Sequence, residues 1–331
     1  MTAHAPTRAG QHAVPEHERP AAARAAAIVF ALTAVLAVLA LAFALPAAKS
    51  KPHEVPIGIA GPQAAGGQAA RVLEQNAPGT FEITYYPGAA ALRDAIENRQ
   101  VYGGIAFDTG QPTLITATGG SPAIAQLLTQ VGSGIAQHNG VQLHIEDLAP
   151  PGAADPRGAG LAASALPITL ASILPAMALV LVLRQQIWLR FGAVVVFAGV
   201  MGVTTAALLR YPLGSVDQNF WGVAGGLTLG IAAALLFVLG LGSLFGRTGL
   251  AIGAGLAVLV GNPLSGLTSA PEMLPAGWGT LGQLLPQGAT ATLLRSTAYF
   301  GGSGATSAIL VLSCWAIAGT ALIAAAAARR A

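Results

Sequence analysis

The sequence contains few charged residues. Asp, Glu, Lys and Arg together make up 9% of the 331 residues, whereas an average soluble domain has about 25%. Hydrophobic residues reach 54%, and the mean hydropathy is +0.64. Low charge combined with long apolar runs argues against an ordinary soluble domain and indicates an integral membrane protein.

The sequence also lacks cysteine pairs and the motifs of several enzyme classes. Its single cysteine, Cys314, lies in an apolar run, so no intrachain disulfide can form. A P-loop requires Gly-Lys-Ser/Thr, but the only Lys followed by Ser is Lys49, which Ala48 precedes. Two His-Glu pairs lack the second histidine of a zinc-protease motif. We find no catalytic cluster, and we expect no enzymatic activity, cofactor, metal site or nucleic-acid partner.

Six apolar runs predict six transmembrane helices. The first, residues 25–45, has 21 residues without a charge, which suits a hydrocarbon layer of about 30 Å. A cleaved signal peptide is the alternative, but its apolar core would have about 7–15 residues, so we favour an uncleaved helix over 25–47. The other runs are 161–183, 191–209, 220–245, 248–260 and 304–328.

Residues 48–160 have a different composition from the apolar runs. They hold nine of the thirteen acidic residues and carry a net charge of −3. Alternating apolar residues and Pro/Gly breaks predict the order β-α-β-α-β-β-α-β, and hence a compact α/β domain. The predicted strands are 55–60, 81–85, 102–107, 114–118 and 141–146, and the predicted helices are 64–76, 89–98 and 122–137.

The distribution of basic residues predicts the orientation. Residues 1–24 have no apolar period and predict a disordered tail. With this tail inside, the cytoplasmic segments sum to +6 and the short outer loops to zero. We therefore predict a multi-pass protein of the cell membrane with both termini cytoplasmic. Its fold class would be an all-α bundle of six transmembrane helices, with an extracytoplasmic α/β domain inserted between helices 1 and 2.

A proline-rich segment, residues 262–303, lies before the last apolar run. Its prolines interrupt any long helix, yet it carries only two charges. We expect a re-entrant segment on the outer side of a five-helix membrane domain, residues 161–331. The expected outer gate of a translocation path comprises Pro271, Glu272, Pro275, Pro286 and Arg295.

Two of the apolar runs carry small residues four positions apart. Such stripes allow close approach of helix backbones in lipid. Plain packing is the simpler interpretation, and sliding of helices during a transport cycle is the alternative. The glycines concerned are Gly222, Gly226, Gly230, Gly249, Gly253 and Gly261.

The layout and several motifs resemble the permeases of type-2 ABC exporters, in particular the phage-infection-protein-like (Pip/YhgE) family. The layout is one helix, a large outer domain and five further helices. A weaker similarity lies at residues 92–107, around Tyr102-Gly103-Gly104. The main motifs are Gly261–Gly266, Pro271–Pro275, Leu285–Ala289, Leu294-Arg295 and Tyr299–Gly302.

The resemblance implies a permease subunit that works with a separate ATP-binding subunit, as a homodimer or a pair of permeases in the lipid bilayer. The family couples to its ATPase through a cytoplasmic segment between helices 2 and 3. Here that segment comprises only residues 184–190, with Arg184, Ile187, Trp188 and Arg190 as the expected coupling residues.

The predicted spans contain no acid, Lys or His in their interiors, which argues against an ion-driven carrier. The same lack of charge favours a lipid-like or amphipathic substrate. The alternative function is a membrane-anchored surface receptor or scaffold, whose α/β domain binds a ligand or partner.

Overall fold

The computed structural model describes residues 21–107, 111–138 and 140–330. The chain divides into two units, Met1–Leu41 and Ala42–Ala331, and each is considered by itself. Of the predicted tail, residues 1–20 lie outside the described residues. Residues 21–24 form the first turn of a helix instead of belonging to the tail, because alanine is the strongest helix former and occupies three of these four positions.

Helix α1, Ala21–Ala48, has 28 residues and is about 42 Å long, enough to cross a bilayer. Its large apolar side chains are exposed around the whole helix; Phe30, for example, is 78% exposed and Leu36 is 62% exposed. A helix that is apolar on all sides suits a surrounding of lipid or protein better than water.

The second unit begins with the end of α1, which is followed by a five-stranded sheet of order β2-β1-β3-β4-β5. Strand β1 is parallel to β2 and β3, and β4 is parallel to β5, while the β3–β4 pair is antiparallel. The order of strands and helices agrees with the one predicted from the sequence. The strands are β1 Val55–Ala60, β2 Phe81–Tyr86, β3 Gly103–Ala106, β4 Thr113–Thr116 and β5 His144–Asp147.

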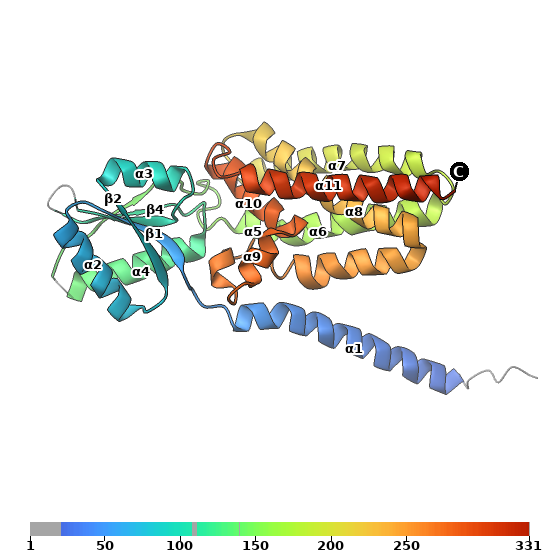
Figure 1. The fold of residues 1–331 in the computed structure, drawn as a ribbon, viewed down its shortest axis with the longest axis horizontal. Helices are drawn as coiled ribbons and strands as arrows, with labels where there is room; N and C mark the ends of the chain where they lie inside the picture. Colours follow the sequence, from blue (N-terminus) through green and yellow to red (C-terminus); the bar gives the residue numbers. More distant parts are fainter. Residues whose placement is uncertain (1–20, 108–110, 139, 331) are drawn as a thin grey trace, which may run out of the picture. The chain divides into compact units, whose positions relative to one another are not determined.

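Three helices cover the two faces of this sheet (Figure 1). Helices α2, Gln63–Asn76, and α4, Pro122–His138, pack on one face, where Ile57 and Leu128 belong to one apolar core. Helix α3, Ala89–Glu97, covers the other face with a second core around Leu92. The α/β region therefore has three layers and buries apolar residues on both sides of the sheet.

Glycine is required where β1 and β3 meet. A Cβ atom on Gly104 would lie 2.1 Å from the carbonyl oxygen of Gly58, and one on Gly58 would lie 2.2 Å from the side chain of Leu92. Real Cβ atoms do not approach other atoms so closely, so the two glycines permit the tight packing of β1, β3 and α3. Gly103, at the start of β3, is restricted in the same way, since its Cβ would lie 2.6 Å from the carbonyl oxygen of Ile115.

Among the residues that the structure describes, five helices are long and apolar enough to cross a membrane. Helix α1 is the first, and the other four belong to the second unit. They are Ala159–Val182, formed by α5 Ala159–Ala163 and α6 Ala165–Val182; α7 Ile187–Arg210; Phe220–Gly261, formed by α8 Phe220–Gly255 and the π-helix η1 Leu256–Gly261; and α11 Thr306–Ala328. The structure is thus that of a mainly helical membrane protein with a small sheet.

The predicted helices 220–245 and 248–260 are joined in α8 across a break at Gly246. Gly246 has φ 63° and ψ −136°, a conformation that only glycine adopts readily. The chain then folds back: a Cβ on Gly249 would lie 2.0 Å from the Leu241 carbonyl oxygen, and one on Gly253 would lie 3.3 Å from Val238. The two parts form a helical hairpin (Figure 1). The second part, residues 247–261, spans only about 22 Å.

The first part of α8 is the centre of the helical region. Leu227, Ile231 and Leu235 are completely buried, and α8 packs against α6, α7, α11 and a further helix, α10 Pro286–Tyr299. A helix surrounded by other helices holds the remaining elements in place. It therefore forms the rigid support against which α10 packs.

Residues 262–303 form a broken segment, as expected from their prolines. It contains the short helix η2 Pro271–Met273, helix α9 Trp278–Gln283 and α10. Helix α10 is buried on nearly all sides. The segment is therefore an integral part of the helical core, and α10 supplies one wall of the site described next.

Candidate functional site

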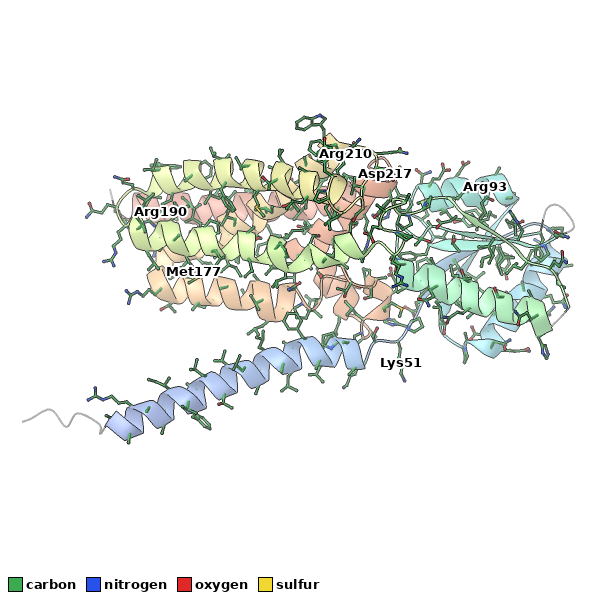
Figure 2. All side chains as sticks on the ribbon, turned by 180° about the vertical axis from the view of Figure 1, so that it is seen from behind. Lys51, Arg93, Met177, Arg190, Arg210 and Asp217 are labelled. Carbon is green, nitrogen blue, oxygen red and sulfur yellow. The ribbon has the colours of Figure 1, made fainter. Side chains whose placement is uncertain are left out.

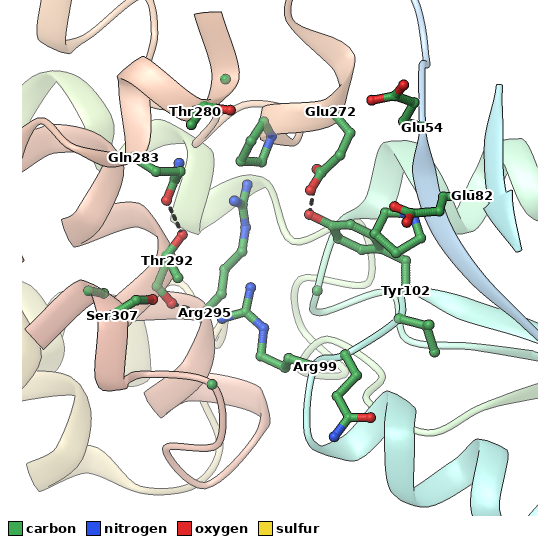
Figure 3. A pocket seen from close by; sticks show the side chains of 18 of the residues that line it. Glu54, Glu82, Arg99, Tyr102, Glu272, Thr280, Gln283, Thr292, Arg295 and Ser307 are labelled. Carbon is green, nitrogen blue, oxygen red and sulfur yellow. Dashed lines mark hydrogen bonds between the residues drawn. The ribbon is translucent and has the colours of Figure 1, made fainter. Parts of the chain in front are cut away.

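A cavity of about 630 Å³ lies between the α/β region and the segment 262–303. Figure 3 shows it from close by, with side chains entering from both parts of the chain. On the α/β side it lies at the amino-terminal ends of β1, β2 and β3, where Glu54, Glu82 and Tyr102 line it. Its size falls within the range of small-molecule sites, about 300–1,000 Å³.

Arg295 of α10 lies in the wall of this cavity and is only 4% exposed. Its Nη2 donates to the carbonyl oxygens of Gly266 at 2.9 Å, Leu267 at 2.7 Å and Ser269 at 3.1 Å. Burial lowers the pKa of Arg295 to about 10, so the guanidinium stays charged at neutral pH. A buried charge is tolerated because these carbonyl dipoles partly replace water.

Arg99 reaches the cavity from the turn that follows α3. It has φ 57°, a left-handed backbone conformation that is unfavourable for residues other than glycine. This conformation directs the side chain to α10, where Nη1 donates to the carbonyl oxygen of Thr292 at 3.0 Å and to Oγ of Ser296. The guanidinium also lies 5.3 Å from the ring centre of Phe300. Burial lowers the pKa of Arg99.

The hydroxyl of Tyr102 donates a hydrogen bond to Oε2 of Glu272 at 2.7 Å, as Figure 3 shows. Burial raises the pKa of Tyr102, and the charge of Glu272 raises it further. The hydroxyl therefore remains a donor at physiological pH. This bond joins the α/β region to the segment 262–303 across 170 residues of sequence.

Backbone contacts reinforce the attachment beside this bond. The amide of His53 donates to the Glu272 carbonyl oxygen at 3.2 Å, and the Ser50 hydroxyl donates to the Met273 carbonyl oxygen at 2.8 Å. The Ser121 hydroxyl donates to the carbonyl oxygen of Ser269 at 3.1 Å. The chain around η2 is thus bonded to three separate places in the α/β region.

The charges of the cavity are divided between its two sides. Figure 3 shows the guanidinium groups of Arg99 and Arg295 on one side and the carboxylates of Glu54 and Glu82 on the other, with Glu272 between them. The cavity also contains neutral polar groups and apolar atoms, so it offers partners of several kinds to one ligand. These further residues are Thr280, Gln283, Leu284, Thr292, Ser307, Ala308 and Val311.

Within residues 21–107, 111–138 and 140–330, no three His, Cys, Asp or Glu side chains gather as a metal site would require.

Three of the five residues expected as an outer gate line the cavity: Pro271, Glu272 and Arg295. The other two shape the backbone next to it. Pro286 occupies the first turn of α10, where its missing N–H costs no helical hydrogen bond, and Pro275 precedes α9, where its carbonyl accepts the Trp278 amide. The structure therefore brings three of the expected gate residues together at one cavity, and the other two take part in the backbone structure of the same segment.

Sequence reasoning missed Arg99 and Tyr102 as residues of this site. Tyr102 lies within the stretch 92–107, which the motif comparison had singled out without giving it a role. The only further signal was an arginine directly after a predicted helix. Arg99 meets α10 and Tyr102 meets η2 through packing between segments 170 to 197 residues apart, which no local pattern reveals.

The expected ATPase-coupling residues divide into buried and exposed ones. Arg190 is 1% exposed and donates to the carbonyl oxygens of Leu183, at 2.6 Å, and Arg184, so it caps the end of α6. Ile187 is 6% exposed. Trp188 is 60% exposed and Arg184 is also at the surface. Only these two present their side chains to a partner in this conformation.

The glycine stripes fit closely against neighbouring atoms. A Cβ on Gly226 would lie 3.2 Å from Leu293, one on Gly230 2.4 Å from Thr290 and one on Gly261 2.1 Å from Gln287, all residues of α10. Gly249 and Gly253 face the first part of α8, and Gly222 faces the side chain of Asn219. These positions support the packing interpretation of the stripes.

Comparison of the chain with known protein families, curated proteins and solved structures found no match.

Proposed function

We propose that the chain is the membrane-spanning permease subunit of an ABC-type exporter, which moves a lipid-like or amphipathic substrate with energy from a separate ATPase subunit. The observation that carries the proposal is the cavity between the α/β region and the segment 262–303. It combines charged groups with apolar atoms of α11, itself a candidate membrane helix. An amphiphile would find partners for both of its ends there.

The proposed topology has six crossings. They are α1, α5–α6, α7, the two parts of the α8 hairpin and α11. The α6–α7 turn, the α8 bend and the C-terminus meet at one end, since Arg330 donates to the carbonyl oxygens of Arg184 at 2.6 Å and Ser243 at 3.4 Å. Figure 2 shows Arg190 at this end and Asp217 near the α/β region. An arginine-rich end is typical of the cytoplasmic side, which makes the α/β region extracytoplasmic.

Cysteine labelling tests this topology. The native thiol is first removed by Cys314→Ser, and a cysteine is then introduced by Asp217→Cys or Arg247→Cys, both at exposed positions. A membrane-impermeant maleimide is expected to label Asp217→Cys in intact cells and Arg247→Cys only after permeabilisation. The opposite pattern would reverse the orientation, and labelling of both from outside would rule out the hairpin as two crossings.

The ATPase would dock at the basic end through Trp188, the largest of the exposed apolar side chains there, which also include Leu189 and Phe245. Replacing Arg190 is a poor test, because it removes the cap of α6. Trp188→Ala is expected to lower co-purification of the ATPase, whereas the matched control Trp221→Ala, which is 75% exposed at the start of α8, is expected to leave it unchanged. Purification without any ATPase, or equal recovery with both variants, would argue against the proposal.

The alternative function, a surface receptor or scaffold, is favoured by the share of the cavity that the α/β region supplies. Residues of both parts of the chain line the cavity, so ligand binding must be measured on the full chain. Ligand binding without an ATPase partner, and without a transport defect on deletion of the gene, would support the receptor.

A further inference from the structure

The two arginines of the cavity have donors that the protein does not use. The hydrogen bonds of Arg295 to described residues all leave from Nη2, and those of Arg99 all leave from Nη1. Neither guanidinium has a nitrogen among the fully buried, unpartnered atoms of the described residues. The remaining N–H groups are therefore accessible, and both arginines line the cavity; Arg295 also lines a smaller pocket of about 100 Å³.

These two guanidinium groups lie close enough to influence one another, since the charge of Arg99 contributes to lowering the pKa of Arg295. Like charges repel, so both arginines gain when an anion lies between them. Guanidinium groups are well suited to phosphate because several N–H donors match its oxygens. The two arginines thus give one side of the cavity the positive charge and the N–H donors that bind a phosphate-type anion.

The opposite side of the cavity is acidic. Glu54 directly precedes β1, and Glu82 lies in β2 opposite Pro56, so both carboxylates sit at the same edge of the sheet (Figure 3). With Glu272, the cavity holds three carboxylates against two guanidinium groups. A ligand with negative charge alone would meet these carboxylates unfavourably, whereas one that also carries an ammonium group would pair with both sides.

A third part of the lining is apolar. Ala308 and Val311 belong to α11, and Leu284 follows α9. These side chains offer a place for hydrocarbon next to a helix that has the length and composition of a membrane span. The lining thus combines a cationic side, an anionic side and an apolar wall.

We propose that this cavity binds a zwitterionic phospho-amphiphile, with its phosphodiester at Arg99 and Arg295, its ammonium group at Glu54 and Glu82, and its hydrocarbon against α11. The inference rests on the proposed function, because it names the substrate class of the same cavity. A lipid and a free zwitterionic phosphodiester share the polar part of this chemistry, and hydrocarbon distinguishes them.

The experiment measures binding of short-chain phosphatidylethanolamine to the full-length protein in detergent, without any ATPase. Phosphatidylglycerol, diacylglycerol of the same chain length and free glycerophosphoethanolamine are compared with it. We expect phosphatidylethanolamine to bind most tightly. Arg99→Gln is expected to weaken it by about tenfold or more, since it removes a charged hydrogen-bond donor, and the control Arg71→Gln, on the exposed face of α2, is expected to have no effect.

Arg99 also bonds α10, so loss of binding in Arg99→Gln has a second possible cause, a loosened structure. Glu82→Gln avoids this, because Glu82 is exposed and its carboxylate takes no part in the attachments described above. It is expected to weaken binding of phosphatidylethanolamine several-fold and to strengthen that of phosphatidylglycerol, which no longer meets this like charge. Glu97→Gln, also exposed, is the matched control. This change in selectivity does not arise from unfolding.

Three results would overturn the inference: equal binding of diacylglycerol and phosphatidylethanolamine, equal affinities of Glu82→Gln and Glu97→Gln for both phospholipids, or binding of free glycerophosphoethanolamine as tight as that of the lipid. Failure of this site differs from failure of the proposed function. ATPase association without lipid binding would remove only the site, and selective lipid binding without an ATPase would remove only the exporter.

Discussion

The hydrogen bond between Tyr102 and Glu272 predicts a measurable coupling between the α/β region and the segment 262–303. The changes are Tyr102→Phe, which removes only the hydroxyl, Glu272→Ala, which removes the acceptor, and the two together. A hydrogen bond to a charged group contributes about 1.5–3 kcal/mol. The bond is short, at 2.7 Å, and partly buried, so a contribution within this range is expected.

Loss of this free energy should make the contact between the α/β region and the segment 262–303 open more often. The amides of Lys51 and His53 donate to the carbonyl oxygens of Met273 and Glu272, and they exchange with solvent only when this contact opens. Hydrogen exchange measured by mass spectrometry on the detergent-solubilised protein therefore reports the contact. Tyr102→Phe is expected to speed exchange of the peptide containing these amides by about 10- to 150-fold.

The double mutant decides whether the bond itself is responsible. If it is, the two single changes will not add, and the coupling free energy will be about 1.5–3 kcal/mol. Tyr85→Phe, at a tyrosine that is 57% exposed, is the control and should leave exchange unchanged. Additivity within about 0.5 kcal/mol, or equal effects of Tyr102→Phe and Tyr85→Phe, would refute the reasoning.

Two further predictions concern packing and acid stability. Gly319→Ala should lower the thermal stability of the detergent-solubilised protein, because the new Cβ would lie 2.5 Å from the backbone of Leu236. Such overpacking costs about 1–3 kcal/mol. The control is Gly225→Ala, whose Cβ would have nothing within 4 Å and which should leave the stability unchanged. Arg93 lowers the pKa of Glu146 through a hydrogen bond, so the ionised form stabilises the fold above the ordinary carboxyl range and this contribution is lost as the pH falls through the lowered pKa. Glu146→Gln should therefore reduce the loss of stability on acidification, and an unchanged acid profile would contradict this.

The α/β region could be predicted well because its signals are local. Alternation in Phe81–Tyr86 and the Pro/Gly breaks that bound the strands act within a few residues, and the resulting order of elements agrees with the structure. The π-helical end at Leu256–Gly261 was not predicted. A run of apolar residues is compatible with an α-helix of 3.6 residues per turn and with a wider π-helix, so the residue types do not distinguish the two.

Burial of charge was harder to predict from the sequence. Arg190 and Trp188 stand two residues apart in a short amphipathic segment, and both were expected to face a partner. The arginine instead turns inward to the carbonyl groups at the end of α6, which lack helical donors. A sequence gives the charge of a residue but not the unsatisfied carbonyls that it will meet, because those belong to the tertiary structure.

Arg295 shows how such burial links structure to the proposed function. Its Nη2 holds the turn at Gly266–Ser269, while its other donors are accessible and the residue lines the cavity. An anion bound at those donors would offset the positive charge and lower the cost of keeping it buried. Ligand binding and the position of the segment 262–303 would then depend on the same guanidinium, so a ligand that binds there would also stabilise the turn at Gly266–Ser269. A lysine at this position could not serve both sides, since it lacks the planar array of donors.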